Sequence, residues 1–239
     1  MHDLTHRSGQ SELLDDDSIP FDAIRQNMQE LNVINRLLGG HAITISGLKK
    51  LLAGSIRREV ITICEIGCGG GDNLKAIDAW CQRSSLAAKF IGIDIKDTCI
   101  EYAKVQYPSM EVTWVVADYR EVSFSETRPD IIFSSLFCHH FSDAALPGML
   151  QWMKQHCTIG FFINDLHRHL LAYYAIKWIT SIFSRSYLVK NDAPLSVARG
   201  FTKAEWKKII GEAGFVHCTI EWKWAFRHLI VYKPTMTTF

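Results

Sequence analysis

Hydrophobic residues follow two different periods along the chain, and the two periods alternate. Compact runs rich in β-branched and aromatic residues predict buried strands, at 60–64, 90–95, 112–116, 130–134 and 160–163. Apolar residues at helical spacing fill the stretches between several of these runs, as in 73–81 and 98–106. Two last runs, 216–222 and 228–232, have the pattern of an antiparallel pair. The alternation predicts an α/β fold with a doubly wound, mostly parallel, seven-stranded sheet covered by helices on both faces.

The segments around this core differ in polarity. Residues 1–17 are polar and acidic and have no apolar signal-peptide core, so a flexible N-terminal arm is expected. Amphipathic helices are expected to form a cap at 18–58, ahead of the main domain at 59–239. A helical insertion at about 168–198 interrupts that domain and is expected to form a lid.

Charge and cysteine content narrow the classes of function. The chain has 26 Lys and Arg against 25 Asp and Glu, so it lacks the basic excess that favours binding to nucleic acid. Lys177 and Arg185 interrupt the most apolar stretch, 170–189, which argues against stable insertion into a membrane. The seven cysteines show no CxxC pair or disulfide spacing, which favours a reducing, cytoplasmic location.

A glycine-rich turn follows the first expected strand. Residues 65–72 read Glu-Ile-Gly-Cys-Gly-Gly-Gly-Asp and lead into a helix, at the sheet edge where open α/β folds bind ligands. A dinucleotide site requires glycine where Asp72 stands, and Asp72 would repel a pyrophosphate. A Walker A loop requires Gly-Lys-Ser/Thr, which is also missing. Both kinds of nucleotide site are disfavoured.

The same turn resembles motif I of the class I S-adenosylmethionine-dependent methyltransferases, E/D-x-G-x-G-x-G. Asp94 and Asp118 end the next two strands in matching positions. The resemblance implies a Rossmann-like methyltransferase fold over about 60–234, with S-adenosylmethionine as cofactor. Asp94 would accept hydrogen bonds from the ribose hydroxyls, and Asp118 would accept one from the adenine amino group. Glu65 would orient the methionyl end of the cofactor. Further cofactor contacts are expected from the same elements, at Gly67, Cys68, Gly69, Asp72, Asn73, Ile95, Tyr119 and Ser135.

Two features outside the core bear on the ligands. Residues 35–40, Asn-Arg-Leu-Leu-Gly-Gly, resemble a segment of methyltransferases encoded near aromatic polyketide enzymes. This resemblance implies that Arg36 contacts the cofactor carboxylate or the substrate, whereas the alternative is a solvated helix arginine. The stripe of Tyr173, Tyr174 and Trp178 suits core packing, a homodimer contact or a wall for an aromatic or lipophilic substrate.

Histidines gather where the acceptor is expected. Residues 136–143 resemble the L-x-H-H-F of ubiquinone-type methyltransferases and the C-H-D-W-S-D of plant phenol O-methyltransferases. The second resemblance implies that His139 is the general base for a phenol, whose pKa of about 10 makes it a poor nucleophile when neutral. His140 and His167 are the other catalytic candidates, and Asp165 or His167 could orient the base. The alternative is that these side chains only line the pocket.

Two comparisons of strand ends exclude neighbouring chemistries. Catechol-type enzymes hold Mg²⁺ with acids after the fourth and fifth strands, where this chain has Ser134-Ser135 and Asn164-Asp165, so no metal is expected. Nucleic-acid amino-methyltransferases carry a Pro-Pro-aromatic run after strand four, which is missing. The expected activity is methyl transfer to a phenolic hydroxyl of an aromatic polyketide or quinone-like natural product, in secondary metabolism. C- or N-methylation and a catalytically idle scaffold stay open.

Overall fold

The computed structural model describes residues 3–16, 18–54, 59–124 and 128–234. Seven strands form one sheet: β1 Val60–Ile66, β2 Ala87–Asp94, β3 Val112–Val116, β4 Ile131–Ser135, β5 Gly160–Leu166, β6 Cys218–Lys223 and β7 Arg227–Tyr232. The strand order is β3-β2-β1-β4-β5-β7-β6. Only β7 runs antiparallel, and it lies between β5 and β6. The predicted doubly wound, mostly parallel sheet is confirmed.

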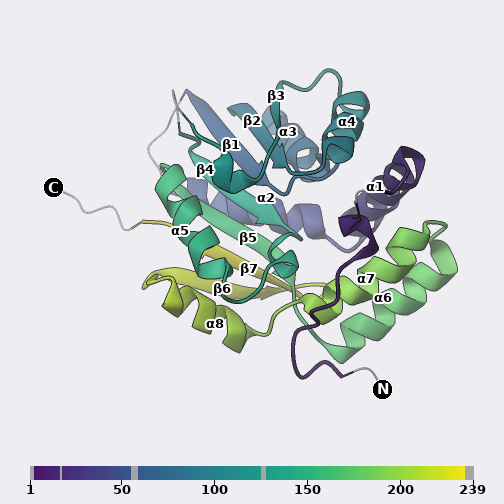
Figure 1. Ribbon diagram of the computed structural model, residues 1–239. Coiled ribbons are helices and arrows are strands. Elements are labelled where there is room, and N and C mark those ends of the chain that lie inside the picture. Colours follow the sequence, from purple (N-terminus) through teal and green to yellow (C-terminus); the bar gives the residue numbers. More distant parts are fainter. Residues whose placement is uncertain (1–2, 17, 55–58, 125–127, 235–239) are drawn as a thin grey trace.

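Helices cover both faces of the sheet (Figure 1). They are α1 Phe21–Leu37, α2 Gly40–Leu52, α3 Asp72–Arg83, α4 Asp97–Gln106, α5 Leu146–His156, α6 Leu170–Phe183, α7 Tyr187–Arg199 and α8 Lys203–Glu212. One apolar core lies between the sheet and α5 and α8, and a second lies between the sheet and α2 and α3. Because both faces of the sheet are buried, the central strands are mostly apolar, as at 131–133 in β4 and 161–163 in β5.

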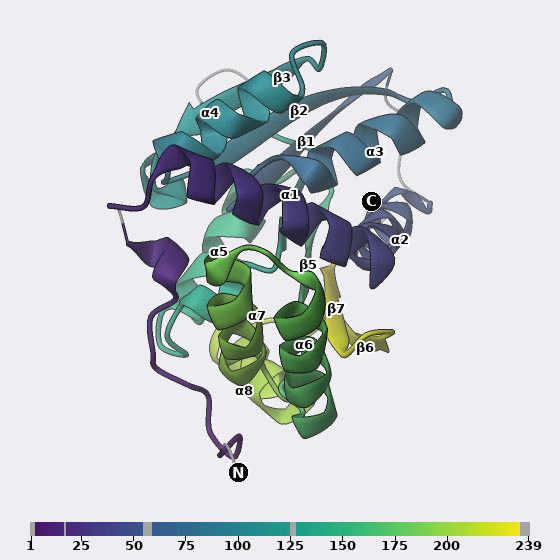
Figure 2. The same cartoon turned by 90° about the vertical axis from the view of Figure 1, so that its right-hand side faces the viewer.

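The insertion after β5 is a pair of packed helices. α6 and α7 lie side by side next to the carboxyl edge of the parallel strands, as Figures 1 and 2 both show. The aromatic stripe is divided, because Tyr173 is buried whereas Trp178 is 68% exposed. The role of this aromatic stripe in a homodimer contact therefore stays a prediction. None of the described helices is long and apolar enough to cross a membrane.

The N-terminal segment, expected as a flexible arm, packs along its described residues 3–16 against α7 and the residues that follow β4. Figure 2 shows it beside α7. Arg7 donates to the backbone carbonyls of Arg199, His139 and Phe141. A 3-10 helix, Leu13–Asp15, follows, and Asp192 of α7 accepts from two N–H groups at its start. This segment therefore brings its own side chains to the sheet edge.

Candidate active site

A cavity of about 790 Å³ opens at the carboxyl edge of the parallel strands. The glycine-rich turn forms one end, and α6, α7 and the β6–β7 turn enclose the other. Most of the predicted site residues line it: Gly67, Cys68, Gly69, Asp72, Asn73, Asp94, Ile95, Asp118, Tyr119, Ser135, His139 and His140. The topology thus gathers at one place side chains that the sequence distributes over four strand ends.

Three predicted residues are not among those that line the cavity. Arg36 is exposed on α1. Glu65 is fully buried in β1, beneath the turn. His167 lies beyond β5, where its ring centroid is 4.7 Å from that of His228, and burial lowers the pKa of His167. The structure therefore gives neither Arg36 nor His167 a direct position at the cavity.

The turn requires glycine for geometric reasons. Gly67, Gly69 and Gly71 all have positive φ, at 65°, 50° and 77°. A Cβ at residue 67 would lie 2.1 Å from the Phe137 ring, and a Cβ at residue 71 would lie 2.6 Å from Trp114. At residue 69 only the Met28 sulfur lies within 4 Å, so this part of the turn is open toward the cavity. The backbone of the turn can therefore approach a ligand closely.

Asp94 and Asp118 differ in how they are held. The Asp94 carboxylate accepts from the backbone N–H of Gly69 at 2.8 Å and of Lys96 at 3.0 Å, and burial raises its pKa. The Asp118 carboxylate accepts from the backbone N–H and the guanidinium of Arg120, which lower its pKa. Each carboxylate oxygen can accept more than one hydrogen bond, so both acids can still bind a ligand hydroxyl or amine.

Two further acids meet below the turn. Both Glu65 carboxylate oxygens are buried without a hydrogen bond of ordinary geometry inside the described structure. Burial, and then the charge of Asp72, raise the pKa of Glu65 well above its usual range, and the Asn73 side chain opposes part of this rise. Asp72 is different: burial would raise its pKa, but His41 at 2.7 Å and Asn35 at 3.0 Å lower it. Asp72 therefore supplies the negative charge at this end of the cavity, whereas the raised pKa of Glu65 favours its uncharged form.

His139 is fixed by the neighbouring strand. It lies on the 3-10 helix Cys138–His140 after β4, and its Nδ1 is 2.8 Å from Asp165 Oδ1 at the end of β5. Both side chains are buried, His139 at 3% and Asp165 at 0% exposure. Burial alone would lower the pKa of His139, but the charge of Asp165 and hydrogen bonds to Asp165 and Glu12 raise it to about 9.

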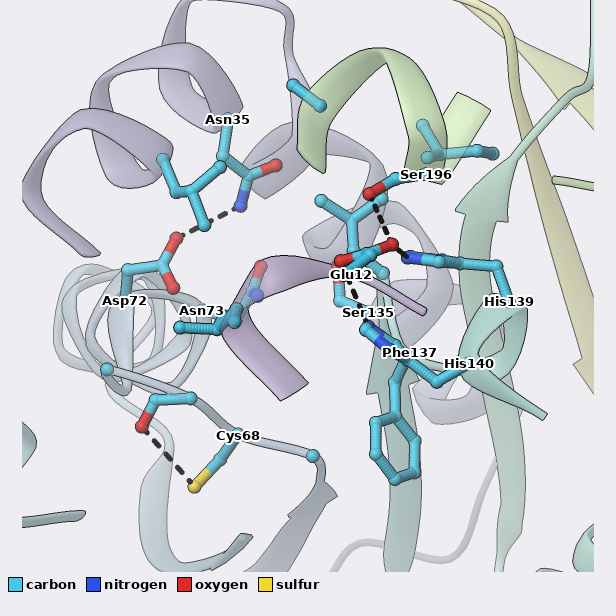
Figure 3. A pocket seen from close by; sticks show the side chains of 18 of the residues that line it. Glu12, Asn35, Cys68, Asp72, Asn73, Ser135, Phe137, His139, His140 and Ser196 are labelled. Atoms are coloured by element: carbon cyan, nitrogen blue, oxygen red, sulfur yellow. Dashed lines mark hydrogen bonds and ion pairs between the residues drawn. The ribbon is translucent and has the colours of Figure 1, made fainter. Parts of the chain in front are cut away.

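Glu12, which the sequence does not single out, lies between the two histidines (Figure 3). Its carboxylate oxygens are 3.5 Å from His139 Nε2 and 3.8 Å from His140 Nε2, and Ser196 Oγ donates to it at 2.7 Å. Burial opposes the change, but the hydrogen bond and charge of His139 lower the pKa of Glu12. Ligand atoms of Glu12, His139 and His140 all lie within 4.8 Å of one another, so these residues could hold a cation.

The comparisons with known proteins agree with this geometry. Residues 63–160 match the family model described as a methyltransferase domain. This match runs from within β1 to the first residue of β5 and includes the glycine-rich turn, Asp94, Asp118 and both adjacent histidines. No curated protein sequence matches the chain.

Solved structures of methyltransferases have the same fold at low sequence identity. The plantazolicin methyltransferase BpumL in complex with SAH is 15% identical, with a TM-score of 0.64, over 90% of this chain and 89% of that one. Human N-acetylserotonin methyltransferase in complex with SAM is 14% identical, with a TM-score of 0.62, over 90% of this chain and 57% of that one. Magnesium protoporphyrin IX methyltransferase from Synechocystis PCC 6803 with bound SAH is 16% identical, with a TM-score of 0.53, over 94% of this chain and 88% of that one.

The fold and the local family match agree with each other. The chain has the class I methyltransferase fold, and its residues 63–160 match the model of a methyltransferase domain. The resemblance to S-adenosylmethionine-dependent methyltransferases that the glycine-rich turn indicated is confirmed.

Proposed function

We propose that the protein transfers a methyl group from S-adenosylmethionine to a phenolic hydroxyl of a small aromatic molecule of the polyketide or quinone type. The observation that carries the proposal is the buried pair of His139 and Asp165, at the same cavity as the glycine-rich turn. The domain match and the fold support the choice of methyl donor. The seven cysteines are all free, which supports a reducing compartment such as the cytoplasm.

The residues at the turn fit the methyl donor. Asp94 would hold the ribose hydroxyls, Asp118 the adenine amino group, and the open backbone at Gly69 would face the nucleoside. This end suits a positively charged amino group, because the Asp72 carboxylate lines it and His41 and Asn35 keep the pKa of Asp72 low. When bound, the donor supplies an electrophilic methyl group on its sulfonium. The volume of about 790 Å³ leaves room for an acceptor beside it.

The histidine pair gives the chain a means of moving the acceptor proton. With Nδ1 donating to Asp165, the remaining nitrogen, Nε2, faces Glu12 and the cavity. While Glu12 stays in contact, the pKa of His139 of about 9 keeps the ring protonated at neutral pH. His139 can therefore accept a phenol proton only after Glu12 moves away or the pH rises. The apolar walls from α6 and the β6–β7 turn would exclude water during transfer.

A methyl-transfer assay tests the proposal. The protein is incubated with labelled S-adenosylmethionine and a panel of phenols, resorcinols and quinols, and mass spectrometry reads the linkage of each product. We expect O-linked products. A product linked only through carbon or nitrogen would overturn the choice of oxygen, and binding of S-adenosylhomocysteine without any transfer would indicate a scaffold. Absence of calorimetric heat with donor and demethylated donor alike would overturn the whole proposal.

A further inference from the structure

Arg227 is a buried cation with two donor atoms that no described residue pairs. It is the first residue of β7, its side chain lines the cavity, and it is only 2% exposed. Its Nε and Nη1 atoms are buried, and neither makes a hydrogen bond within the part of the chain that the structure describes. A charge removed from water without pairing is costly, so such a group in a cavity wall is expected to have a ligand.

The acids near Arg227 do not supply that partner. Asp72 and Asp165 act on it only through their charge. Asp72 already binds Asn35 and His41, and Asp165 binds His139 and two backbone N–H groups. Burial lowers the pKa of Arg227 to about 10, so the guanidinium is still charged at neutral pH. The two acids make a buried cation tolerable but do not pair with its Nε and Nη1 atoms.

The residues around Arg227 indicate that its Nε and Nη1 atoms lie at the border between the two ends of the cavity. Trp222, Trp224 and Phe226, from the β6–β7 hairpin, line the same side as Arg227. A Cβ at Gly40, in α2, would lie 1.6 Å from Asn35 Oδ1 and 3.0 Å from Arg227 Nη1, so glycine leaves room there for both side chains. A ligand that meets Arg227 therefore has an aromatic wall on one side and the acidic end near Asp72 on the other.

We propose that Arg227 binds a carboxylate in this cavity. A guanidinium presents paired N–H donors whose geometry matches the two oxygens of a carboxylate, and a buried, charge-assisted pair of this kind is strong. The inference rests on the proposed function, which offers two sources of this group. One is the amino-acid end of the methyl donor, and the other is a carboxylate on an aromatic acceptor.

Calorimetry tests the first source. S-adenosylhomocysteine and an analogue that lacks only its carboxylate are each titrated into the unmodified protein and into Arg227→Met, Arg227→Lys and Arg36→Met. We expect the unmodified protein to prefer the carboxylated compound by roughly 10- to 100-fold. Arg227→Met should abolish the preference and Arg227→Lys should keep part of it. Arg36→Met, which removes an exposed arginine of α1, should keep all of it.

A second titration tests the acceptor. 4-Hydroxybenzoate and 4-hydroxybenzamide are titrated into the protein with and without S-adenosylhomocysteine. If Arg227→Met keeps the preference for S-adenosylhomocysteine over its analogue but loses a preference for 4-hydroxybenzoate over 4-hydroxybenzamide, the carboxylate belongs to the acceptor. Loss of either preference in Arg227→Met supports the proposal.

The proposal is overturned if Arg227→Met and Arg227→Lys stay folded, as thermal unfolding shows, and change neither preference. Arg227 would then act only as a structural charge, which alters the unfolding temperature without discriminating carboxylates. If Arg227→Met does not fold, Arg227→Lys decides, because it keeps the charge and loses the paired donors. Failure of the unmodified protein to bind S-adenosylhomocysteine would refute the proposed function instead, and the benzoate titration without donor would still test Arg227.

Discussion

The two ends of the cavity are built in different ways. The donor end, at β1 to β3, depends on backbone geometry: three glycines with positive φ, and an aspartate held by two N–H groups. The acceptor end, at β4 and β5, depends on buried charged side chains, Glu12, His139 and Asp165, which lie far apart in the sequence. The comparison teaches that backbone shape sets the glycine-rich turn at the first end, whereas mutual charge pairing sets the side chains at the second.

His139→Gln should have the largest effect, because it removes the ionisable ring and nearly preserves the shape. We expect kcat to fall roughly 100- to 10,000-fold, as for loss of a general base, with unchanged affinity for S-adenosylhomocysteine. Steady-state kinetics with an acceptor found in the panel, together with calorimetry, measure both. His167→Gln is the matched control outside the cavity and should stay within about twofold of the unmodified enzyme. An equal loss in both variants would refute the role of His139.

Gly67→Ala tests shape at the donor end. The new Cβ would lie 2.1 Å from the Phe137 ring at a φ of 65°, so the turn must shift. Overpacking of this kind costs about 1–3 kcal/mol, and we expect affinity for S-adenosylhomocysteine to fall roughly 10- to 100-fold. Calorimetry measures the affinity. Gly148→Ala in α5, where nothing lies within 4 Å, is the control, and unchanged affinity in Gly67→Ala would contradict the expectation.

The pH profile of kcat tests charge at the acceptor end. A base must be neutral to accept a proton, so activity should rise with pH toward the His139 pKa of about 9. Glu12→Gln removes one of the charges that raise this pKa, and we expect the midpoint to move down by about one pH unit. Glu101→Gln, at an exposed position on α4, should leave the profile unchanged. If the midpoint of the kcat profile is the same in Glu12→Gln as in the unmodified enzyme, Glu12 does not influence the proton transfer.

Stability should follow the same ionisation with the opposite sign. Folding raises the pKa of His139 from 6.5 to about 9, so the folded state holds this proton more tightly than the unfolded chain. The resulting stabilisation is complete below about pH 6.5 and is lost as the pH rises through about 9. Thermal unfolding across this range, compared with His139→Gln, should show a smaller pH dependence in the variant. Parallel curves for the two proteins would contradict the pKa shift.

The smallest expected effect is that of a chelator. Glu12, His139 and His140 are close enough to hold a cation, but a protonated His139 between two carboxylates leaves no free lone pair for one. We expect EDTA to change kcat by less than about twofold. Loss of activity that added Zn²⁺ or Mn²⁺ restores would show that a metal is required.

Much of the donor end was predictable because its signals are local. The glycine-rich turn follows a mostly apolar strand, Asp94 is the last residue of β2, and Asp118 lies two residues after β3. The strand positions were also predictable, since the apolar runs are short and rich in β-branched and aromatic residues, which favours strands over buried helices. Their ends were misplaced by a few residues: β5 continues to Leu166 and so carries Asn164 and Asp165 within the strand.

The acceptor end was predictable only where it coincides with a strand end, as at His139 and Asp165. Glu12 has the local sequence of a solvated acid, and only the packing of the N-terminal segment on α7 brings it to the histidines. Arg227 reaches the cavity because β7 inserts between β5 and β6, a pairing that no local pattern encodes. The helix α7 contains Pro194 and has no clear apolar face, so the sequence shows no helical spacing of apolar residues there.

The ring of Phe137 lies between the two ends, packed on Gly67 and edge-on against Phe141. One aromatic side chain therefore sets the spacing between the donor wall and the histidine-bearing wall. Related proteins that lose this ring would have to compensate at residue 67 or let the walls approach each other. We expect residues 67 and 137 to change together during divergence, as a coupled pair that adjusts the reach of methyl transfer.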